Sequence, residues 1–353
     1  MDSGNAMWFR SQPEFFAPKL SRGGVCYAAV IPCSIPVRMH QLNSIRGFNV
    51  TGQFSKKMGA LSAAAMALIP SLAMAQEGTA GHPVPGQFHL QPSVTPIMDS
   101  ITAFHDGILM WTISLIVVFV LVLLLWIVYR FNAKRNPVPA SFTHNTTVEV
   151  IWTVLPIVAL IVIAIPSFGV LSDQLTTPDG ERKYLGSNIF SFGEVEVPAP
   201  ELTIKAIGQQ WYWDYEYVDQ EVDMSSLMLS EEDRAELKPG QPRLLAVDAE
   251  LVVPVDTTVR LQVTADPLGV IHAFAVPSFG IKIDAVPGRL NETWFNSRET
   301  GIFYGQCSEL CGKDHAFMPI AVRVVTKDEF KTFMAAFEAD GYDAANATLA
   351  AVQ

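Results

Sequence analysis

The chain has 353 residues, half of them hydrophobic, and a formal net charge of −11 at pH 7. Its mean hydropathy is positive, which indicates a membrane component joined to a sizeable folded domain. An acidic chain lacks the basic surface that binds phosphate backbones, so we expect no nucleic-acid partner.

The first 75 residues are predicted to be an N-terminal extension followed by a cleaved signal peptide. Lys56 and Lys57 precede an apolar run that starts at Met58, and the run ends in Ala73-Met74-Ala75. A basic start, an apolar centre and a small-x-small end are typical of a secretory signal. We predict cleavage after Ala75. A short buried helix is the alternative, and the sequence does not decide the translation start.

Two long uncharged runs follow. They extend from Gly107 to Tyr129 and from Val150 to Leu171, which is 23 and 22 residues. Each is long enough to cross a bilayer core of about 30 Å, and a buried helix of a soluble protein is the alternative. The predicted order is an external segment over 76–106, a transmembrane helix over 107–131, a link over 132–149 and a second transmembrane helix over 150–171.

The positive charges indicate the orientation of this hairpin. Arg130, Lys134 and Arg135 lie in or beside the link, whereas residues 76–106 contain no Lys or Arg. Cytoplasmic loops carry an excess of basic residues, so the link is expected in the cytoplasm and both ends outside. We predict a multi-pass protein of the cell inner membrane, with its N-terminus and its C-terminal domain in the periplasm.

The composition changes at Asp173. From there to Gln353 the chain has 29 acidic and 14 basic residues, a formal charge of −15. Short alternating segments punctuated by Pro and Gly predict an external antiparallel β-sandwich or barrel over 172–338. The expected elements are strands over 202–207, 250–255, 258–263 and 320–325, an inserted loop with a short helix around 225–240, a helix over 328–337 and a loose C-terminal tail over 339–353.

A set of metal-ligand side chains lies near the end of the chain. Cys307 and Cys311 are four residues apart, His315 and Met318 follow within seven residues, and His272 lies 35 residues upstream of Cys307. Thiolates, imidazoles and a thioether suit copper better than hard metal ions. Zinc and a structural disulfide are the alternatives, although neither uses Met318. Two thiols among five ligand side chains favour two metals with bridging thiolates over one blue-copper ion.

The run Cys307-Ser308-Glu309-Leu310-Cys311-Gly312-x-x-His315-x-x-Met318 resembles the binuclear copper-A motif of cytochrome c oxidase subunit II, from the bacterial aa3-type haem-copper oxidases. The resemblance extends from about His82 to Thr326. It implies a two-helix transmembrane hairpin followed by an all-β, cupredoxin-like Greek-key barrel. The implied copper-A ligands are the side chains of His272, Cys307, Cys311, His315 and Met318 and the backbone carbonyl of Glu309.

Three further roles follow from the same resemblance. The Glu309 side chain is implied to bind a magnesium or manganese ion shared with the large subunit. Trp211 is implied to be the place where electrons enter, although adjacent aromatic residues are more often core packing, and Gln209 stands where the family often has His. Glu149 is implied to lie at the mouth of a proton pathway, and a solvated helix-start carboxylate is the alternative.

Acidic residues that follow Trp211 form the expected docking surface. A negative face attracts a basic electron carrier and speeds its encounter, whereas the alternative role of such residues is solubility. Residues 284–291 also resemble the family and are expected to pack on the large subunit. The expected docking residues are Asp214, Glu216, Asp219, Glu221 and Asp223.

The resemblance implies the electron-transfer subunit of an oxidoreductase and translocase. Electrons would pass from cytochrome c to copper-A and then to a haem of subunit I, where oxygen is reduced to water and protons are pumped. Expected partners are subunit I with its haem and copper-B, subunit III, cytochrome c and membrane lipid. The chain has no Cys-x-x-Cys-His run, so no haem is expected on it.

Two other classes of protein remain as alternatives. One is the copper-free counterpart of this subunit in quinol oxidases, and the other is a membrane-anchored copper carrier. The intact ligand set argues against the first, and Trp211, Glu149 and the two-helix anchor argue against the second. The sequence leaves open which cytochrome c is the donor, the haem type of the partner, the identity of the shared ion and the number of accessory subunits.

Overall fold

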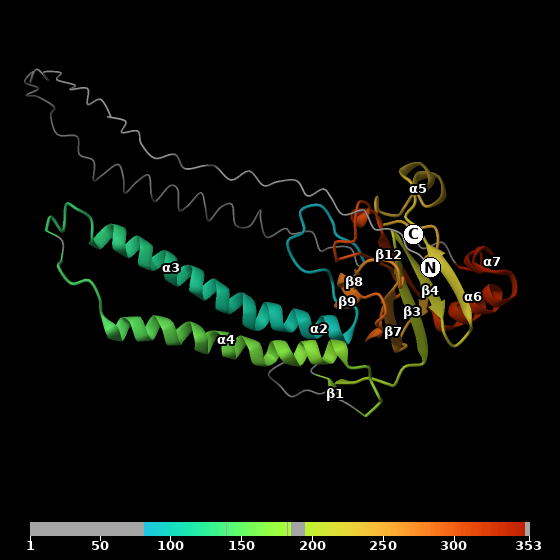
Figure 1. Cartoon of the computed structure of the whole chain (residues 1–353), viewed down its shortest axis with the longest axis horizontal. Helices are drawn as coiled ribbons and strands as arrows, with labels where there is room; N and C mark the ends of the chain where they lie inside the picture. Colours follow the sequence, from blue (N-terminus) through green and yellow to red (C-terminus); the bar gives the residue numbers. More distant parts are fainter. Residues whose placement is uncertain (1–80, 139, 182, 185–194, 350–353) are drawn as a thin grey trace, which may run out of the picture. The chain divides into compact units, whose positions relative to one another are not determined.

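The computed structural model describes residues 81–138, 140–181, 183–184 and 195–349 (Figure 1). The predicted N-terminal extension and signal peptide lie outside the described residues, as do the first residues of the predicted external segment. The described chain contains a helical hairpin that ends at Leu175 and a β-domain that follows it.

Two long helical arms form the hairpin. The first is a continuous helical stretch that contains one π-helical segment, and the second continues through Pro156 and Pro166. Both arms are long and apolar enough, by length and composition, to cross a membrane. The bounds are α2 Pro96–Ala103, η1 Phe104–Leu109 and α3 Met110–Arg130 in the first arm and α4 Thr146–Leu175 in the second.

Local capping explains why the first arm starts eleven residues before the predicted membrane helix at 107. The Thr95 side chain accepts a hydrogen bond from the Met98 N–H, and Pro96 takes the first helical position. Asn145 caps α4 in the same way through the Val148 N–H. The caps therefore decide where the helices begin, and the membrane boundaries remain predictions.

Most apolar side chains of α3 and α4 are exposed. Leu125 of α3 and Ile161 of α4 are 61% and 55% exposed, and their neighbours are similar. Large continuous apolar surfaces of this kind are rare in soluble monomers. A helix that is apolar on all sides needs an apolar surrounding, so the two arms fit a transmembrane hairpin.

The β-domain contains several sheets (Figure 1). The five-stranded sheet has the order β10-β7-β3-β4-β5, the three-stranded sheet has the order β11-β12-β6, and β8–β9 and β1–β2 form separate pairs. The strands are β1 Lys183–Tyr184, β2 Val195–Glu196, β3 Leu202–Gln209, β4 Tyr212–Tyr217, β5 Val222–Ser226, β6 Leu251–Pro254, β7 Val259–Ala265, β8 His272–Val276, β9 Ile281–Ala285, β10 Asn291–Phe295, β11 Gly301–Gln306 and β12 Pro319–Val325.

The sheets are mixed, which corrects the expectation of a purely antiparallel sandwich or barrel. β3 and β7 are parallel, and so are β12 and β6, whereas the other described pairs are antiparallel. Parallel partners need a long crossover connection, and alternation within one strand does not reveal such a distant partner. The four predicted strands correspond to β3, β6, β7 and β12, and the predicted short helix of the inserted loop is α5 Glu231–Leu237.

Alternation along β3 and β4 separates the core from the outer face. Leu202 and Ile204 of β3 and Trp213 and Tyr215 of β4 are buried, while the residues between them are only half-buried. Each large apolar side chain buried in this way stabilises the fold by about 1.5–3 kcal/mol. The same alternation directs Asp214 to the outer face of the sheet.

The C-terminal segment differs from the loose tail expected over 339–353. Helix α6, Lys327–Asp340, extends beyond the predicted end, and α7, Tyr342–Asn346, follows it. The Tyr342 hydroxyl accepts a hydrogen bond from the Glu250 N–H at 2.7 Å and donates one to the Glu250 carbonyl at 3.1 Å. These bonds fasten α7 to the β-domain, a contact over 92 residues that composition does not reveal.

Hydrogen bonds join the end of α4 to the β-domain. The Trp294 indole N–H donates to the Asp173 carbonyl at 2.8 Å, and the Thr293 hydroxyl donates to the Gln174 carbonyl at 2.8 Å. The Gln174 side chain donates to the Gly280 carbonyl at 2.9 Å. Helix α4 is therefore joined to the β-domain by hydrogen bonds as well as by the continuous backbone.

Candidate metal centre

A loop at the end of the β11–β12 hairpin carries most of the predicted ligands. The two strands pair antiparallel up to Gln306 opposite Pro319. Residues 307–318 close the hairpin, and the Cys307 N–H donates to the Met318 carbonyl at 3.2 Å across the base of the loop. Because a strand holds each end of the loop, the side chains of the loop have well-defined positions.

The upstream ligand, His272, comes from a different strand pair and begins β8. The Ser308 N–H donates to the Ala273 carbonyl at 3.0 Å, so the loop is bonded to β8 beside His272. On the other side, a Cβ added to Gly208 of β3 would lie 2.9 Å from the His272 ring. The ring of Trp213 also lies edge-on to the imidazole, with 6.0 Å between centroids. These contacts fix the position of the imidazole.

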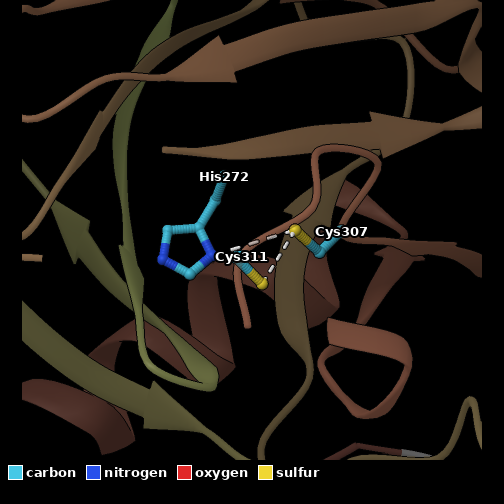
Figure 2. A group of neighbouring side chains, drawn as sticks. All are labelled: His272, Cys307 and Cys311. Atoms are coloured by element: carbon cyan, nitrogen blue, oxygen red, sulfur yellow. Dashed lines mark hydrogen bonds between the residues drawn. The ribbon is translucent and has the colours of Figure 1, made fainter. Parts of the chain in front are cut away.

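Figure 2 shows His272, Cys307 and Cys311 with their ligand atoms close together. The Cys307 Sγ lies 3.8 Å from the His272 Nδ1 and 3.8 Å from the Cys311 Sγ. All three ligand atoms lie within 4.8 Å of one another. The group is compact enough for its members to act as ligands of a shared metal centre.

The other predicted ligands lie around the same two sulfur atoms. The His315 Nδ1 and the Met318 Sδ are each 3.5 Å from the Cys311 Sγ. The Glu309 carbonyl oxygen lies 3.3 Å from the Cys307 Sγ. One imidazole and a carbonyl therefore accompany Cys307, and the other imidazole and the thioether accompany Cys311. The structure brings together every copper ligand that the sequence predicted, in two groups.

Most ligand side chains of this cluster are buried. His272 is fully buried, and Cys307, Cys311 and Met318 are at most 3% exposed. Burial and the adjacent Cys307 raise the pKa of the Cys311 thiol to about 12, and burial and His315 lower the pKa of His272. Both shifts favour neutral side chains. A bound metal ion would instead favour the deprotonated form of the thiols, because metals bind thiolates and neutral imidazoles.

The donor atoms of the ligands also fit a metal. The His272 Nε2 is buried and has no hydrogen-bond partner among the described residues, whereas Nδ1 faces the Cys307 sulfur. Cys307 and Cys311 are both free thiols. Zinc would use the same nitrogen and sulfur atoms but not the Met318 thioether, so the donor set fits copper better.

Trp211 lies in the turn between β3 and β4, against the ligand loop. Its indole N–H donates to the Cys311 carbonyl at 3.0 Å. A Cβ added to Gly312 would lie 3.0 Å from the indole, and Gly312 has a φ of +123°, so the close approach favours glycine for two reasons. The structure thus brings the predicted electron-accepting tryptophan to a backbone atom of a predicted copper-ligand residue.

Three of the predicted docking residues lie on the outer face of the β3–β4–β5 sheet. Asp214 accepts a hydrogen bond from the Gln209 side chain at 2.9 Å, so Gln209 faces this side and not the ligand cluster. Glu216 forms an ion pair with Lys205 at 2.9 Å and lies opposite Asp223. Asp214 and Glu216 are half-buried and Asp223 is exposed, and all three lie on strands next to the turn that carries Trp211.

The other two predicted docking residues lie in or beside the β4–β5 turn. Asp219 accepts a hydrogen bond from the Thr203 N–H at 2.9 Å, so it also stabilises the turn. Glu221 is exposed and has a φ of +56°, a conformation that non-glycine residues rarely adopt. Both residues have a local conformational role that the sequence did not indicate.

Glu149 lies in the first turn of α4. Its carboxylate accepts a hydrogen bond from the Asn145 N–H at 3.3 Å, which adds to the cap of the helix. Helix α4 has 30 residues, a length of about 45 Å, and the β-domain follows its opposite end. The structure does not bring Glu149 to the ligand cluster, and its role in proton uptake remains a prediction.

An open cavity of about 770 Å³ includes the exposed side chain of Glu309. The segment 284–291, which was expected to contact the large subunit, supplies much of its wall. Sequence analysis missed the contributions of Leu175, Lys282 and Glu292, which come from α4, β9 and β10. The lining residues are Leu175, Lys282, Ile283, Asp284, Val286, Arg289, Leu290, Asn291, Glu292 and Glu309.

Sequence analysis also missed two residues that lie against functional side chains. Gly208 interrupts the apolar alternation of β3, and a glycine inside a strand is a known signal of close approach by another group. Here that group is the His272 imidazole. The second residue is Lys313, whose Nζ lies 5.2 Å from the centroid of the Trp211 ring. No sequence pattern connects these two distant residues.

A two-helix anchor followed by a β-domain, with a buried group of His and Cys side chains that could hold a metal ion, defines a membrane-anchored protein of the cupredoxin-like class. The family model of the cytochrome C oxidase subunit II transmembrane domain matches residues 83–170, and that of the periplasmic domain matches residues 202–325. The chain belongs to the cytochrome c oxidase subunit II family, and is therefore a subunit of an oxidoreductase complex.

Individual relatives agree with the family models. A protein of Rickettsia bellii (strain RML369-C) described as probable cytochrome c oxidase subunit 2 is 45% identical over 273 residues, which cover 77% of this chain and 92% of that protein. Cytochrome c oxidase subunit 2 of Cereibacter sphaeroides is 40% identical over 294 residues, which cover 78% of this chain and 89% of that protein. Among solved structures, the periplasmic domain of subunit II (CoxB) of Bradyrhizobium japonicum is 58% identical, covers 39% of this chain and 94% of that chain, and has a TM-score of 0.36.

Proposed function

We propose that this chain accepts electrons from cytochrome c at a binuclear copper-A centre and passes them to a haem of subunit I. The observation that carries the proposal is the convergence of two imidazoles, a thioether and a carbonyl on two buried thiols. When bound, the copper pair supplies one-electron redox chemistry. Oxygen reduction to water and proton pumping take place in subunit I, outside this chain, and this chain carries no haem.

The chain's own residues would hold the copper pair in a prearranged cage. Cys307 and Cys311 would supply both thiolates, with His272 and the Glu309 carbonyl beside Cys307. The imidazole and thioether of the ligand loop would complete the side of Cys311. Because strands hold both ends of the ligand loop and His272 begins β8, we expect little ligand movement when an electron arrives.

Electrons would enter through Trp211. Its indole is half-buried and is hydrogen-bonded to the Cys311 carbonyl, which supports a short route to the ligand cluster. Asp214, Glu216 and Asp223 extend an acidic surface along the adjacent sheet, and Asp219 and Glu221 add charge at its turn. Such a surface attracts a small basic cytochrome c and speeds its encounter.

The cavity beside Glu309 would contact subunit I. Its wall combines the cations Lys282 and Arg289 with the acids Asp284 and Glu292, a pattern suited to a polar protein interface. The exposed Glu309 carboxylate suits a magnesium or manganese ion whose other ligands come from subunit I. The apolar arms α3 and α4 would contact subunits I and III and membrane lipid.

The location follows from the same assignment. After cleavage of a signal peptide behind Ala75, the chain would lie in the cell inner membrane with its N-terminus and β-domain in the periplasm. Glu149 would then lie at the cytoplasmic start of α4, where its half-buried carboxylate would take up protons for the large subunit. The basic link beside it supports this orientation.

Metal content and an electron paramagnetic resonance spectrum of the full-length, copper-loaded chain in detergent test the copper assignment. We expect two coppers per chain and an unpaired electron whose hyperfine splitting arises from two equivalent copper nuclei. One copper per chain, or none in a chain with a folded β-domain, would overturn the assignment. A copper carrier or a copper-free structural subunit would then be the better interpretation.

The role of Trp211 has a separate test. In Trp211→Ala, we expect the copper spectrum to be unchanged, because Trp211 supplies no ligand atom, while reduction of copper by cytochrome c slows at least tenfold. Trp294→Phe serves as the matched control, because this tryptophan is buried and hydrogen-bonded to α4. Equal rates in wild type and Trp211→Ala would show that electrons enter elsewhere.

A further inference from the structure

The ammonium group of Lys313 lies over the ring of Trp211. The Lys313 Nζ is 5.2 Å from the ring centroid, within the range of a cation–π contact. Three consecutive residues of the ligand loop hold the tryptophan: the Cys311 carbonyl accepts its N–H, Gly312 lies against its ring, and Lys313 covers it. The cation is therefore held at the surface through which electrons are proposed to enter.

The charge of Lys313 remains available to a docking protein. Its ion-pair partner among the described residues is Asp314, at 3.5 Å, and the two side chains are 76% and 42% exposed. Exposed pairs of this kind are weak and strongly screened. Lys313 thus presents a positive charge in a segment, Asp173 to Gln353, whose formal charge is −15.

Exposed apolar side chains accompany Lys313 in the same loop. Leu310 is 77% exposed and Phe317 is 45% exposed, although both lie close in sequence to buried ligands. Leu268, in the connection that leads from β7 to His272, is 97% exposed. The loop around Lys313 therefore combines exposed apolar side chains with one lysine and the carboxylates of Glu309 and Asp314, and further acidic groups lie on the adjoining sheet. Exposed aromatic side chains among charged groups are typical of protein interfaces.

We propose that Lys313 is a specificity-determining residue that selects electron donors whose contact surface carries no positive charge opposite Trp211. The favoured donor is a protein with basic groups at the rim of its contact surface and an uncharged centre. This inference rests on the proposed function, in which Trp211 receives the electron. It adds a repulsive element to the attraction that the acidic surface provides.

The two elements act at different distances. The acidic surface attracts every basic protein over about one Debye length, roughly 8–10 Å at physiological salt. Lys313 is a single positive charge, so at a distance it reduces this attraction only slightly. Its repulsion is largest at contact, where a donor cation facing Trp211 would meet a like charge, and such juxtaposition is unfavourable. A basic protein with the wrong arrangement would thus be attracted and yet fail to dock productively, which is how repulsive contacts create specificity.

The test compares two donors on the full-length, copper-loaded chain in detergent. The donors are a small basic cytochrome c and a variant of it with one added lysine beside its exposed haem edge. Rapid-mixing kinetics gives the second-order rate constant for copper reduction at several salt concentrations. In the wild-type chain we expect the added lysine to lower the rate constant about tenfold at low salt, an effect that shrinks as salt rises.

Charge reversal identifies the residue responsible for this discrimination. In Lys313→Glu we expect the added lysine to cause no loss of rate, or a gain, while the copper content and spectrum remain those of wild type. Lys331→Glu is the matched control: Lys331 is 78% exposed, lies 3.8 Å from Asp328 on α6, and its replacement changes the net charge equally. We expect this control to discriminate between the donors as wild type does.

The possible outcomes separate the two proposals. If the wild-type copper is reduced and the ratio of the two donor rates is the same in wild type, Lys313→Glu and Lys331→Glu, the role of Lys313 is overturned and the proposed function stands. If neither donor reduces the wild-type copper, the proposed function is wrong and the inference fails with it.

Discussion

Two clusters of buried polar side chains in the β-domain differ in whether they contain their own counter-charges. In one, Glu250 is fully buried and is bonded to Arg323, to Lys238 at 2.8 Å and to Gln241 at 2.5 Å. In the other, Cys307 and Cys311 are buried beside His272, His315 and Met318. The first cluster contains its own counter-charges, and the second contains none.

The pKa shifts express this difference. Burial works to raise the pKa of Glu250, but the hydrogen bond from Arg323 and the charges of Arg323 and Lys238 outweigh it and lower that pKa. At Cys311, burial and Cys307 act in the same direction and raise the pKa. A cluster that contains its own counter-charges stabilises the fold without a bound ion. A cluster of potential anions with no internal cation instead favours binding of one from outside.

The largest expected effect comes from removing one of the two thiols that are proposed to bridge the coppers. In Cys307→Ser we expect complete loss of the shared unpaired electron in the paramagnetic resonance spectrum, because a hydroxyl does not replace a bridging thiolate between two coppers. Circular dichroism of the full-length chain should show a retained β-domain. Ser308→Ala in the same loop should keep the two-copper spectrum, since Ser308 contributes its backbone N–H. A normal spectrum in Cys307→Ser would remove the bridging role.

Breaking the cluster that contains its own counter-charges should instead affect stability. In Glu250→Gln, Arg323 and Lys238 lose their shared carboxylate, and loss of one partner of a buried ion pair costs about 3–5 kcal/mol of unfolding free energy. Chemical unfolding of the full-length chain at pH 7 measures the loss. The copper spectrum of folded protein should be unchanged, and a changed spectrum would mean that the two clusters are coupled.

The same substitution has a defined pH dependence. The folded-state pKa of Glu250 is lowered, so its contribution is complete above the unfolded-state value of about 4.3 and is lost as pH falls through the folded-state value. The stability difference between wild type and Glu250→Gln should therefore shrink in acid below about pH 4. A difference that stays constant across this range would contradict the ion-pair account.

A smaller effect is expected where β3 lies against the imidazole. A Cβ at Gly208 would lie 2.9 Å from the His272 ring, and overpacking of this kind costs about 1–3 kcal/mol. In Gly208→Ala we expect moderately lower stability together with unequal hyperfine splitting at the two coppers. Gly240→Ala is the control, because nothing lies within 4 Å of its Cβ. Unchanged splitting in Gly208→Ala would show that the imidazole position is not set from β3.

The smallest effect is expected on the outer face of the sheet. Glu216 and Lys205 form an ion pair, but their side chains are 41% and 32% exposed. In Glu216→Gln we expect a stability change of about 0–1 kcal/mol, because water screens such a pair. Unfolding measured beside Glu250→Gln gives a direct contrast between an exposed and a buried pair. A loss of unfolding free energy as large as that of Glu250→Gln would contradict the distinction between an exposed and a buried ion pair.

The ligand set and the membrane arms could be predicted from the sequence because both depend on local information. Cys307, Cys311, His315 and Met318 lie within one loop, and their spacing already indicates a soft metal site. The apolar runs of α3 and α4 are continuous in sequence, so their length and composition indicate their character without a partner. Only the Glu309 carbonyl required the resemblance, since every residue has a backbone carbonyl and its residue type does not mark it as a ligand.

The features missed by sequence analysis depend on distant partners. Arg323 meets Glu250 across 73 residues, and Trp211 meets the Cys311 carbonyl across 100 residues. The parallel pairing of β3 with β7 likewise depends on a crossover connection. No residue in these pairs carries a local signal of its partner, because alternation and spacing describe only neighbours along one element.

The sequence by itself determined which ligand side chains the candidate site contains, and the identity and spacing of these thiols, imidazoles and thioether favour copper over zinc or a disulfide. It also determined the apolar arms, because their hydropathy is a property of the segment alone. Only the tertiary structure decided which nitrogen of His272 faces the sulfur, which glycine touches its ring and which lysine covers Trp211. These choices depend on the packing of strands far apart in the chain, and packing fixes distances that composition and spacing do not contain.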